Sequence, residues 1–401
     1  MAKKRKKLKK TVKFIIFLFL VGACLVGFGF YKIKFEKKPV EKKKVVKKIK
    51  KKKEEPSEYS FNLFMVGDAL IHYGVYADAK QSDGSYDFKP MLQYTKPISS
   101  KYDLAYYNQE TILGGASLGY SSYPMFNSPQ EVGDAFIDSG FDLVSLATNH
   151  TMDKREEGVL KSVEYWKKHP EVITSGQWSS EEERTASITK VHEKNGIKYA
   201  FISYTMWNNG LPTPVGKEYL NNEYSEEKAK TDIESVRDKV DVVIVAMHWG
   251  TEYSLGVDAA QEKETEYLSS LGVDLIIGAH PHVVEPVEYV NDNKTFVIYS
   301  LGNFISDQDG TERLTGLMMD VTIKKKINKD KTSTITVENP HAELVYTAAN
   351  RGRGYNTNFR LYSYKNLNDS ILPGYKTYYE KYKAVVSERY PELQWGLLGE
   401  A

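Results

Sequence analysis

Cysteine is almost absent from this 401-residue sequence, in which Cys24 is the single example. One cysteine cannot form a disulfide within the chain, so no disulfide framework stabilises the fold. A metal site built from several thiolates is excluded for the same reason. The folded part must therefore be stabilised by its core, which a composition of 41% hydrophobic and 12% aromatic residues can supply.

Positive charge is outweighed by negative charge beyond residue 53. Residues 1–53 contain 21 Lys or Arg and 2 Glu, a net charge of +19, whereas the remainder contains 34 basic and 51 acidic residues, a net charge of −17. An acidic body lacks the electrostatic footprint that binds phosphate backbones, so nucleic acid is excluded as a partner. The basic head suits an anionic lipid or wall polymer, although such lysine runs more often serve as solvated spacers.

Long apolar runs are also rare, and one stands out. Residues 14–31 form an unbroken apolar stretch of 18 residues. As a helix it would reach about 27 Å, close to the thickness of the hydrocarbon layer. Residues 1–13 carry eight basic side chains, so we expect a cytoplasmic basic segment followed by a transmembrane signal anchor.

Thirteen lysines follow the apolar run, which opposes this orientation, but the first segment often dominates and long domains translocate largely regardless of charge. Residues 20–24 also resemble a lipobox, so a lipoprotein attached through Cys24 and a cleaved soluble form remain alternatives. Residues 32–58 are too charged to bury a core and are predicted to be a Lys-rich linker. The expected location is the cell membrane, with a single span and an extracytoplasmic domain.

The body alternates short apolar runs with helical stretches. Strands are predicted at residues 61–66, 104–107, 143–147, 199–203, 242–247, 275–277 and 296–300. Helices are predicted at residues 156–168, 226–239 and 259–271. This alternation indicates an α/β domain over residues 59–325. Strands at 317–324 and 333–338 are predicted to form a β-hairpin. Residues 326–401 are expected to be the C-terminal region, with this hairpin and a helical tail packed on the domain.

Polar side chains follow many of these strands directly. Five of the eight histidines lie at or just after predicted strand ends: His72, His150, His248, His280 and His282. Asp68, Glu110 and Asn149 occupy similar positions. Ligands of α/β sheets bind outside the carboxyl ends of the strands, so we expect these side chains to converge on one site.

The residue types suit a pair of divalent metal ions. Imidazoles, carboxylates and an amide oxygen fit zinc, manganese or iron, and two such ions can hold a phosphate between them. Taken singly, some of these motifs could have a purely structural role. His72 alone could be a satisfied histidine, and Asn149 with His150 could cap a helix. His280 and His282 flank Pro281 just after a predicted buried strand, and packing alone rarely explains such a pair of histidines.

The motifs occur in a recognisable order: Val66-Gly67-Asp68, Asn108-Gln109-Glu110, Asn149-His150-Thr151-Met152-Asp153, His248-Trp249-Gly250-Thr251-Glu252, Gly278-Ala279-His280-Pro281-His282-Val283 and Tyr299-Ser300-Leu301-Gly302-Asn303-Phe304. This order resembles the CapA family of poly-γ-glutamate capsule synthesis, within the calcineurin-like metallophosphoesterases, over residues 61–320. The resemblance implies a four-layer αββα sandwich.

The resemblance also implies residue roles. One metal ion would be held by Asp68, Glu110 and His282, and the other by Glu110, Asn149, His248 and His280. Glu110 would replace the more usual bridging aspartate. His150, oriented by Asp153, would be the histidine that assists the leaving group. Substrate contacts are expected from His72, Asn108, Trp249, Glu252 and Asn303.

Two functions remain open. The first is a metal-dependent hydrolase of the phosphoesterase type, acting on capsule polymer or a phosphorylated envelope compound. The second is a non-catalytic, metal-containing accessory protein that binds polymer or the membrane subunits of capsule synthesis and export. The presence of His150 favours the enzyme, whereas the acidic body argues against a polyanionic substrate. A domain with purely structural histidines is a third option.

Overall fold

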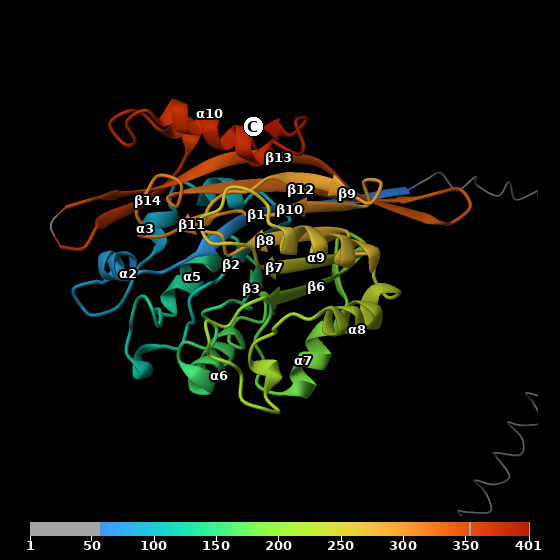
Figure 1. Ribbon diagram of the computed structural model, residues 1–401, viewed down its shortest axis with the longest axis horizontal. Helices are drawn as coiled ribbons and strands as arrows, with labels where there is room; N and C mark the ends of the chain where they lie inside the picture. Colours follow the sequence, from blue (N-terminus) through green and yellow to red (C-terminus); the bar gives the residue numbers. More distant parts are fainter. Residues whose placement is uncertain (1–56, 353, 401) are drawn as a thin grey trace, which may run out of the picture. The chain divides into compact units, whose positions relative to one another are not determined.

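Two β-sheets pack face to face in the computed structural model, which describes residues 57–352 and 354–400 (Figure 1). The first sheet has the strand order β14 (Thr357–Ser363), β13 (Ser333–Asn350), β12 (Thr315–Ile327), β1 (Ser57–Ala69), β2 (Leu104–Asn108), β3 (Leu143–Ser145) and β4 (Ile173–Ser175). Two short strands join it, because β11 (Asn303–Ile305) pairs with β1 and β15 (Gln394–Trp395) pairs with β13.

The second sheet has the order β5 (His192–Lys194), β6 (Ile197–Thr205), β7 (Val242–His248), β8 (Leu275–Ala279), β10 (Thr295–Ile298) and β9 (Val287–Val290). Strands β6, β7, β8 and β10 run parallel, and the edge strands β5 and β9 are antiparallel to their neighbours. The central strands read as continuous apolar runs because both of their faces are buried, as is usual for parallel sheets.

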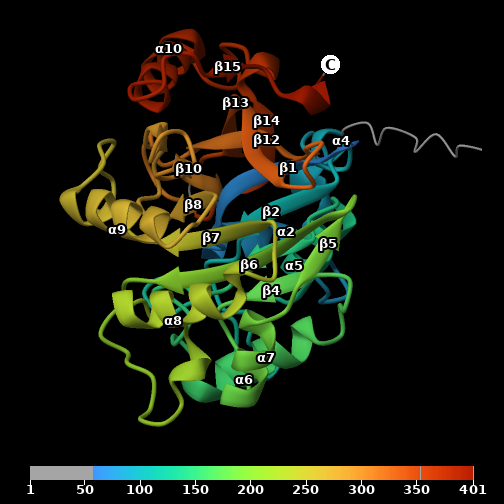
Figure 2. The same cartoon turned by 90° about the vertical axis from the view of Figure 1, so that its right-hand side faces the viewer.

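Helices cover the outer face of each sheet and complete four layers (Figure 2). Buried side chains of α2 (Tyr73–Ala79), α3 (Lys89–Leu92), α4 (Lys96–Ser99), α5 (Glu131–Asp138) and α6 (Arg155–Trp166) pack with outward residues of the first sheet. Those of α7 (Glu181–Ile188), α8 (Glu226–Arg237) and α9 (Ala259–Ser270) pack on the second. Alternate residues of β1, such as Leu63 and Met65, enter the core between the sheets with Ile244 of β7.

This arrangement confirms the predicted α/β class. Each predicted strand and helix of the body appears, with ends shifted by a few residues. Helices α5 and α7 and strands β4, β5, β9 and β11 are among the elements that were not predicted, because their segments are short. Ser57 and Glu58 belong to β1 rather than to a linker.

The C-terminal hairpin is longer than expected and continues the first sheet. The expected division between residues 325 and 326 falls inside β12, and β13 pairs with both β12 and β14. The tail is fixed to the same structure, since Asp320 accepts hydrogen bonds from the Tyr102 hydroxyl at 2.6 Å and the Leu398 amide at 3.0 Å. Side chains of α10 (Tyr375–Val386) join the same hydrophobic core as residues of both sheets.

The predicted membrane anchor falls in the part of the chain that the structure does not describe. Residues 1–13, 14–31 and nearly all of 32–58 fall outside the described residues. Within 57–352 and 354–400, we find no helix long and apolar enough to cross a membrane.

Two motif glycines let neighbouring backbones approach closely. A Cβ atom on Gly67 would lie 1.8 Å from the Gly302 carbonyl oxygen, and one on Gly278 would lie 1.8 Å from that of Tyr299. Each glycine precedes a predicted metal ligand, Asp68 or His280, by one or two residues. The glycines therefore help to set the positions of these ligands.

We expect Gly278→Ala to lower the unfolding free energy by about 1–3 kcal/mol, because the added methyl group must displace backbone. Urea denaturation monitored by circular dichroism measures the change. Gly256→Ala is the matched control, since a Cβ there meets nothing within 4 Å. Equal stability of the two variants would contradict the close-packing argument.

Candidate metal centre

The carboxyl ends of β1, β2 and β3 bring the first group of side chains together. Asp68 lies near the end of β1, opposite Asn108 of β2 on one side and Asn303 of β11 on the other. Glu110 follows β2, and Asn149 follows β3. All of these side chains are buried. The strand pairing therefore places the polar residues at one edge of the sheet, as the sequence predicts.

The second sheet supplies the imidazoles from the facing edge. His248 is the last residue of β7, and its backbone pairs with Ala279 at the end of β8. His280 and His282 follow β8 and have positive φ angles of 100° and 61°. Such angles cost a non-glycine residue roughly 1–3 kcal/mol and are concentrated at functional sites. The strained turn brings both imidazoles to the facing edge of the first sheet.

One cluster forms around His282 and Asp68. The His282 Nδ1 atom lies 3.1 Å from Asp68 Oδ2 and 3.1 Å from Asn303 Oδ1. The Asn108 side-chain amide donates a 2.8 Å hydrogen bond to Asp68 Oδ1. We call these four residues the Asp68 cluster.

A second cluster forms around His248. Its Nε2 atom lies 3.0 Å from Asn149 Oδ1 and 3.2 Å from His280 Nδ1. The Asn149 amide nitrogen is held 3.3 Å from Asn209 Oδ1, which directs the Asn149 oxygen toward His248. We call Asn149, His248 and His280 the His248 cluster.

Glu110 lies between the two clusters. Its Oε1 atom is 3.5 Å from His282 Nε2 and 3.9 Å from His248 Nε2. Neither carboxylate oxygen has a hydrogen-bond partner among the described residues. Burial raises the pKa of Glu110 well above its usual range, and the nearby Asp68 carboxyl raises it further. Such a buried, unpaired carboxylate is costly unless a cation binds it.

Burial keeps two of the histidines, His248 and His280, in the neutral form that binds metals. Burial lowers the pKa of His280 to about 3, with the neighbouring His282 adding to the effect. The pKa of His248 is well below its usual value, again mainly through burial. Groups of Glu110 with His280 and His282, and of Glu110 with Asp68 and His248, each bring ligand atoms within 4.8 Å of one another. The donors fit one or two divalent metal ions.

His150 and Asp153 form a separate pair beside the clusters. The His150 Nδ1 atom lies 2.8 Å from Asp153 Oδ2, which also accepts a 2.7 Å hydrogen bond from the Phe126 amide. The Phe126 ring packs edge-on against both His150, at 4.7 Å, and His72, at 5.3 Å. Burial lowers the pKa of His72 to about 4, and the charges of His282 and His150 lower it further. His72 therefore lies near the site without joining either cluster.

Two predicted substrate residues differ in their positions. Trp249 is 1% exposed in the core behind the second sheet, and its indole N–H donates to the Tyr299 carbonyl. A side chain so placed offers no group to a ligand. Glu252 lines a cavity of about 540 Å³ that His280 and Trp207 also line. This cavity therefore adjoins the His248 cluster.

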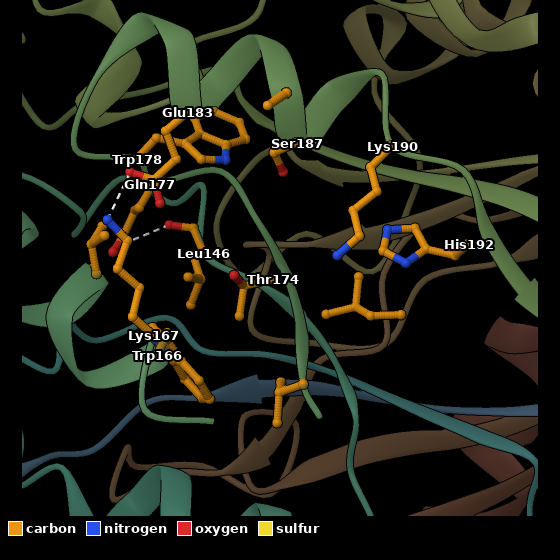
Figure 3. A pocket seen from close by; sticks show the side chains of 14 residues that line it. Leu146, Trp166, Lys167, Thr174, Gln177, Trp178, Glu183, Ser187, Lys190 and His192 are labelled. Atoms are coloured by element: carbon orange, nitrogen blue, oxygen red, sulfur yellow. Dashed lines mark hydrogen bonds and ion pairs between the residues drawn. The ribbon is translucent and has the colours of Figure 1, made fainter. Parts of the chain in front are cut away.

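Several residues at the site were not predicted from the sequence: Phe126, Trp207, Asn209 and Tyr253. They lie in loops outside the strand-end motifs, so no strand-end pattern marked them. A smaller cavity of about 280 Å³ lies near α6, β4 and α7 (Figure 3). Trp166, Trp178 and Lys190 line it, but none of the predicted site residues does. We assign it no role in the metal centre.

The fold and the site define an α/β protein whose two sheets bring together a buried donor set suited to divalent metal ions. The chain belongs to the family described as bacterial capsule synthesis protein PGA_cap, whose sequence profile matches residues 62–308. This match confirms the resemblance recognised from the motifs.

Two relatives have capsule-related names. The PGA biosynthesis protein CapA of Bacillus subtilis (strain 168) is 29% identical over 196 residues, covering 47% of this chain and 48% of that protein. The capsule biosynthesis protein CapA of Bacillus anthracis is 24% identical over 254 residues, covering 62% and 60%. The matched part of the chain thus spans about half of the first relative and three fifths of the second.

Similar solved structures include a putative 5'-nucleotidase from Staphylococcus aureus, with 16% identity and a TM-score of 0.45, covering 71% of this chain and 54% of that one. A phosphatase from Mycoplasma pneumoniae has 14% identity and a TM-score of 0.42, covering 70% and 95%.

Metal affinity is expected to rise with pH, because Glu110 must lose a proton before it binds a cation. Its raised pKa keeps it protonated above the usual carboxyl range, so each pH unit below that pKa should weaken binding up to about tenfold. Calorimetric Mn²⁺ titrations in buffers of different ionisation enthalpy measure the released proton. Glu110→Gln should lose both the affinity and the proton release, whereas the exposed Glu266→Gln should lose neither. Binding that is independent of pH would contradict this role.

Proposed function

We propose that this protein is a metal-dependent hydrolase of the phosphoesterase type that acts in capsule synthesis. The observation that carries the proposal is Glu110, a buried carboxylate without a hydrogen-bond partner in the described residues, lying between two clusters of metal-binding side chains. Membership of the PGA_cap family and the names of the two relatives support the link to the capsule.

Two divalent ions would supply Lewis acidity toward a phosphoester and lower the pKa of a water molecule. The protein itself would hold the metal ligands in position and donate a proton to the leaving group. Asp153 accepts from His150 Nδ1 and thereby fixes the orientation of that ring, which is 5% exposed. His150 Nε2 can then protonate a leaving oxygen.

The proposal includes a location and partners. The apolar run of residues 14–31 would anchor the chain in the cell membrane and place the folded domain outside, unless lipidation at Cys24 does so. Membrane subunits of capsule synthesis or export would be its partners. The substrate would be poly-γ-glutamate or a phosphorylated envelope compound. Protease digestion of intact cells tests the location, because an extracytoplasmic domain is cleaved and a cytoplasmic one is protected.

We expect His150→Ala to keep its metal ions and to lose about 10²–10⁴-fold in turnover of bis-p-nitrophenyl phosphate, since His150 lies outside both metal-binding clusters. The double variant His280→Ala/His282→Ala should lose metal as well as activity. Metal content by elemental analysis and initial rates are measured on the same preparations of the full chain in detergent.

The same preparations test the alternative. A wild-type protein that holds metal but hydrolyses no phosphoester, across metals and pH, would favour the non-catalytic accessory protein. A wild-type protein that holds no metal would reject both functions.

Arg313 offers a positive charge for an anionic substrate. Its guanidinium lies 4.9 Å from the centre of the Tyr253 ring, which is 6.1 Å from the His282 ring. Its Nε atom has no hydrogen-bond partner in the described part of the chain and forms only a long ion pair with Glu312, at 3.8 Å. Arg313 thus brings a cation near the Asp68 cluster that is only weakly paired.

We expect Arg313→Gln to raise KM about tenfold with kcat changed less than about twofold, because a charge-assisted contact to the substrate is lost. Arg351→Gln removes the same charge from a residue that pairs with Asp307 and Asp309, and it should leave KM unchanged. Steady-state kinetics with an anionic phosphodiester give both values. Equal KM values for the two variants would rule out Arg313 as a substrate contact.

A further inference from the structure

Asn303 occupies a position in the Asp68 cluster that matches the position of Asn149 in the His248 cluster. The Asn303 Oδ1 atom lies 3.1 Å from His282 Nδ1, and the Asn149 Oδ1 atom lies 3.0 Å from His248 Nε2. Two ligand atoms bound at about 2.1 Å and at right angles to one ion lie about 3.0 Å apart. Both contacts therefore have the spacing of neighbouring ligands.

The Asn303 amide is oriented by two acceptors. Its Nδ2 atom donates to Gln308 Oε1 and to the Arg313 carbonyl oxygen, each at 2.8 Å. With both of its N–H groups used, the amide points Oδ1 toward His282 Nδ1, which also contacts Asp68. The side chain is 0% exposed, so this orientation is fixed by the protein rather than by solvent.

A hydrogen bond alone accounts poorly for this geometry. The single proton that His282 Nδ1 can carry faces two acceptor oxygens at the same 3.1 Å distance, Asp68 Oδ2 and Asn303 Oδ1. Three atoms that can each bind a metal ion therefore lie close together with at most one proton among them. This arrangement is expected of a cation site.

We propose that Asn303 is a metal ligand, so that Asp68, Glu110, Asn303 and His282 hold one divalent ion. This assignment rests on the proposed metal centre and replaces the predicted substrate role of Asn303. The resulting site offers three oxygens and one nitrogen, whereas Glu110, Asn149, His248 and His280 offer two of each. The oxygen-rich site suits a harder ion such as Mn²⁺ better than the nitrogen-rich site does.

The test is Mn²⁺ binding by the full chain in detergent, measured by calorimetry and by electron paramagnetic resonance. Wild type should bind two ions and give the multiline signal of a coupled pair. Asn303→Leu, which is close in size but has no ligand atom, should bind one ion and give the six-line signal of isolated Mn²⁺. Asn303→Ser, whose hydroxyl is too short to reach the ion, should behave in the same way.

Asn222→Leu is the matched control. Asn222 is also 0% exposed and its side chain also makes hydrogen bonds, but these go to Arg184 and to the Ser203 carbonyl. This variant pays a similar cost of losing a buried amide and should keep two ions. Near-ultraviolet circular dichroism checks that each variant is folded.

The outcomes separate the two proposals. A coupled pair retained in folded Asn303→Leu or Asn303→Ser, even with weaker binding, would show that Asn303 only orients His282, and the ligand assignment would fall. A wild-type protein that binds no Mn²⁺ or Zn²⁺ would overturn the metal centre itself. A coupled pair in wild type and a single ion in both Asn303 variants would establish the ligand.

Discussion

The buried Glu110 carboxylate is the constraint on which the site depends. Both of its oxygens lack a donor in the described residues, and Asp68, a second buried carboxyl, lies close enough to raise its pKa. Removing such groups from water costs several kcal/mol each unless a cation compensates. Two of the surrounding imidazoles, His248 and His280, cannot do so as cations, because burial keeps them neutral. An ionised Glu110 therefore calls for a cation, and the geometry provides ligands for one.

The facing of two sheets makes this concentration of donors possible. Asp68, Asn108 and Glu110 come from the first sheet, and His248, His280 and His282 from the second. The interlayer core holds these edges together, while glycines at positions 67 and 278 permit the close backbone contacts beneath them. Stability and function are thus coupled, because a change that separates the sheets also separates the ligands.

Sequence reasoning predicted correctly which side chains at the ends of buried strands lie close together. Asp68 and His248 were predicted because strand ends in an α/β fold share one edge. It failed where side-chain direction decides. Trp249 directly follows His248 in the chain, yet its ring enters the core behind the sheet. The sequence shows that the two residues are neighbours, but only the backbone conformation shows that their side chains point to opposite sides. Phe126 reaches His150 from a loop, so only the tertiary structure could identify it.

The acidic body does not forbid an anionic substrate. Two divalent ions at the centre would bring four positive charges, and their ligands Asp68 and Glu110 would offset two, because the amides carry no charge and burial keeps His248 and His280 neutral. The ions together with these two carboxylates would then carry a net positive charge. At physiological ionic strength the Debye length is about 8 Å. Most of the acidic groups behind the net charge of −17 on residues 54–401 therefore have little effect on the potential at the centre if they lie farther away than this. Arg313 packs on the Tyr253 ring, which in turn packs near His282, and it brings a further positive charge to this side of the centre. Local electrostatics at the centre therefore favour an anion even though the domain as a whole repels one.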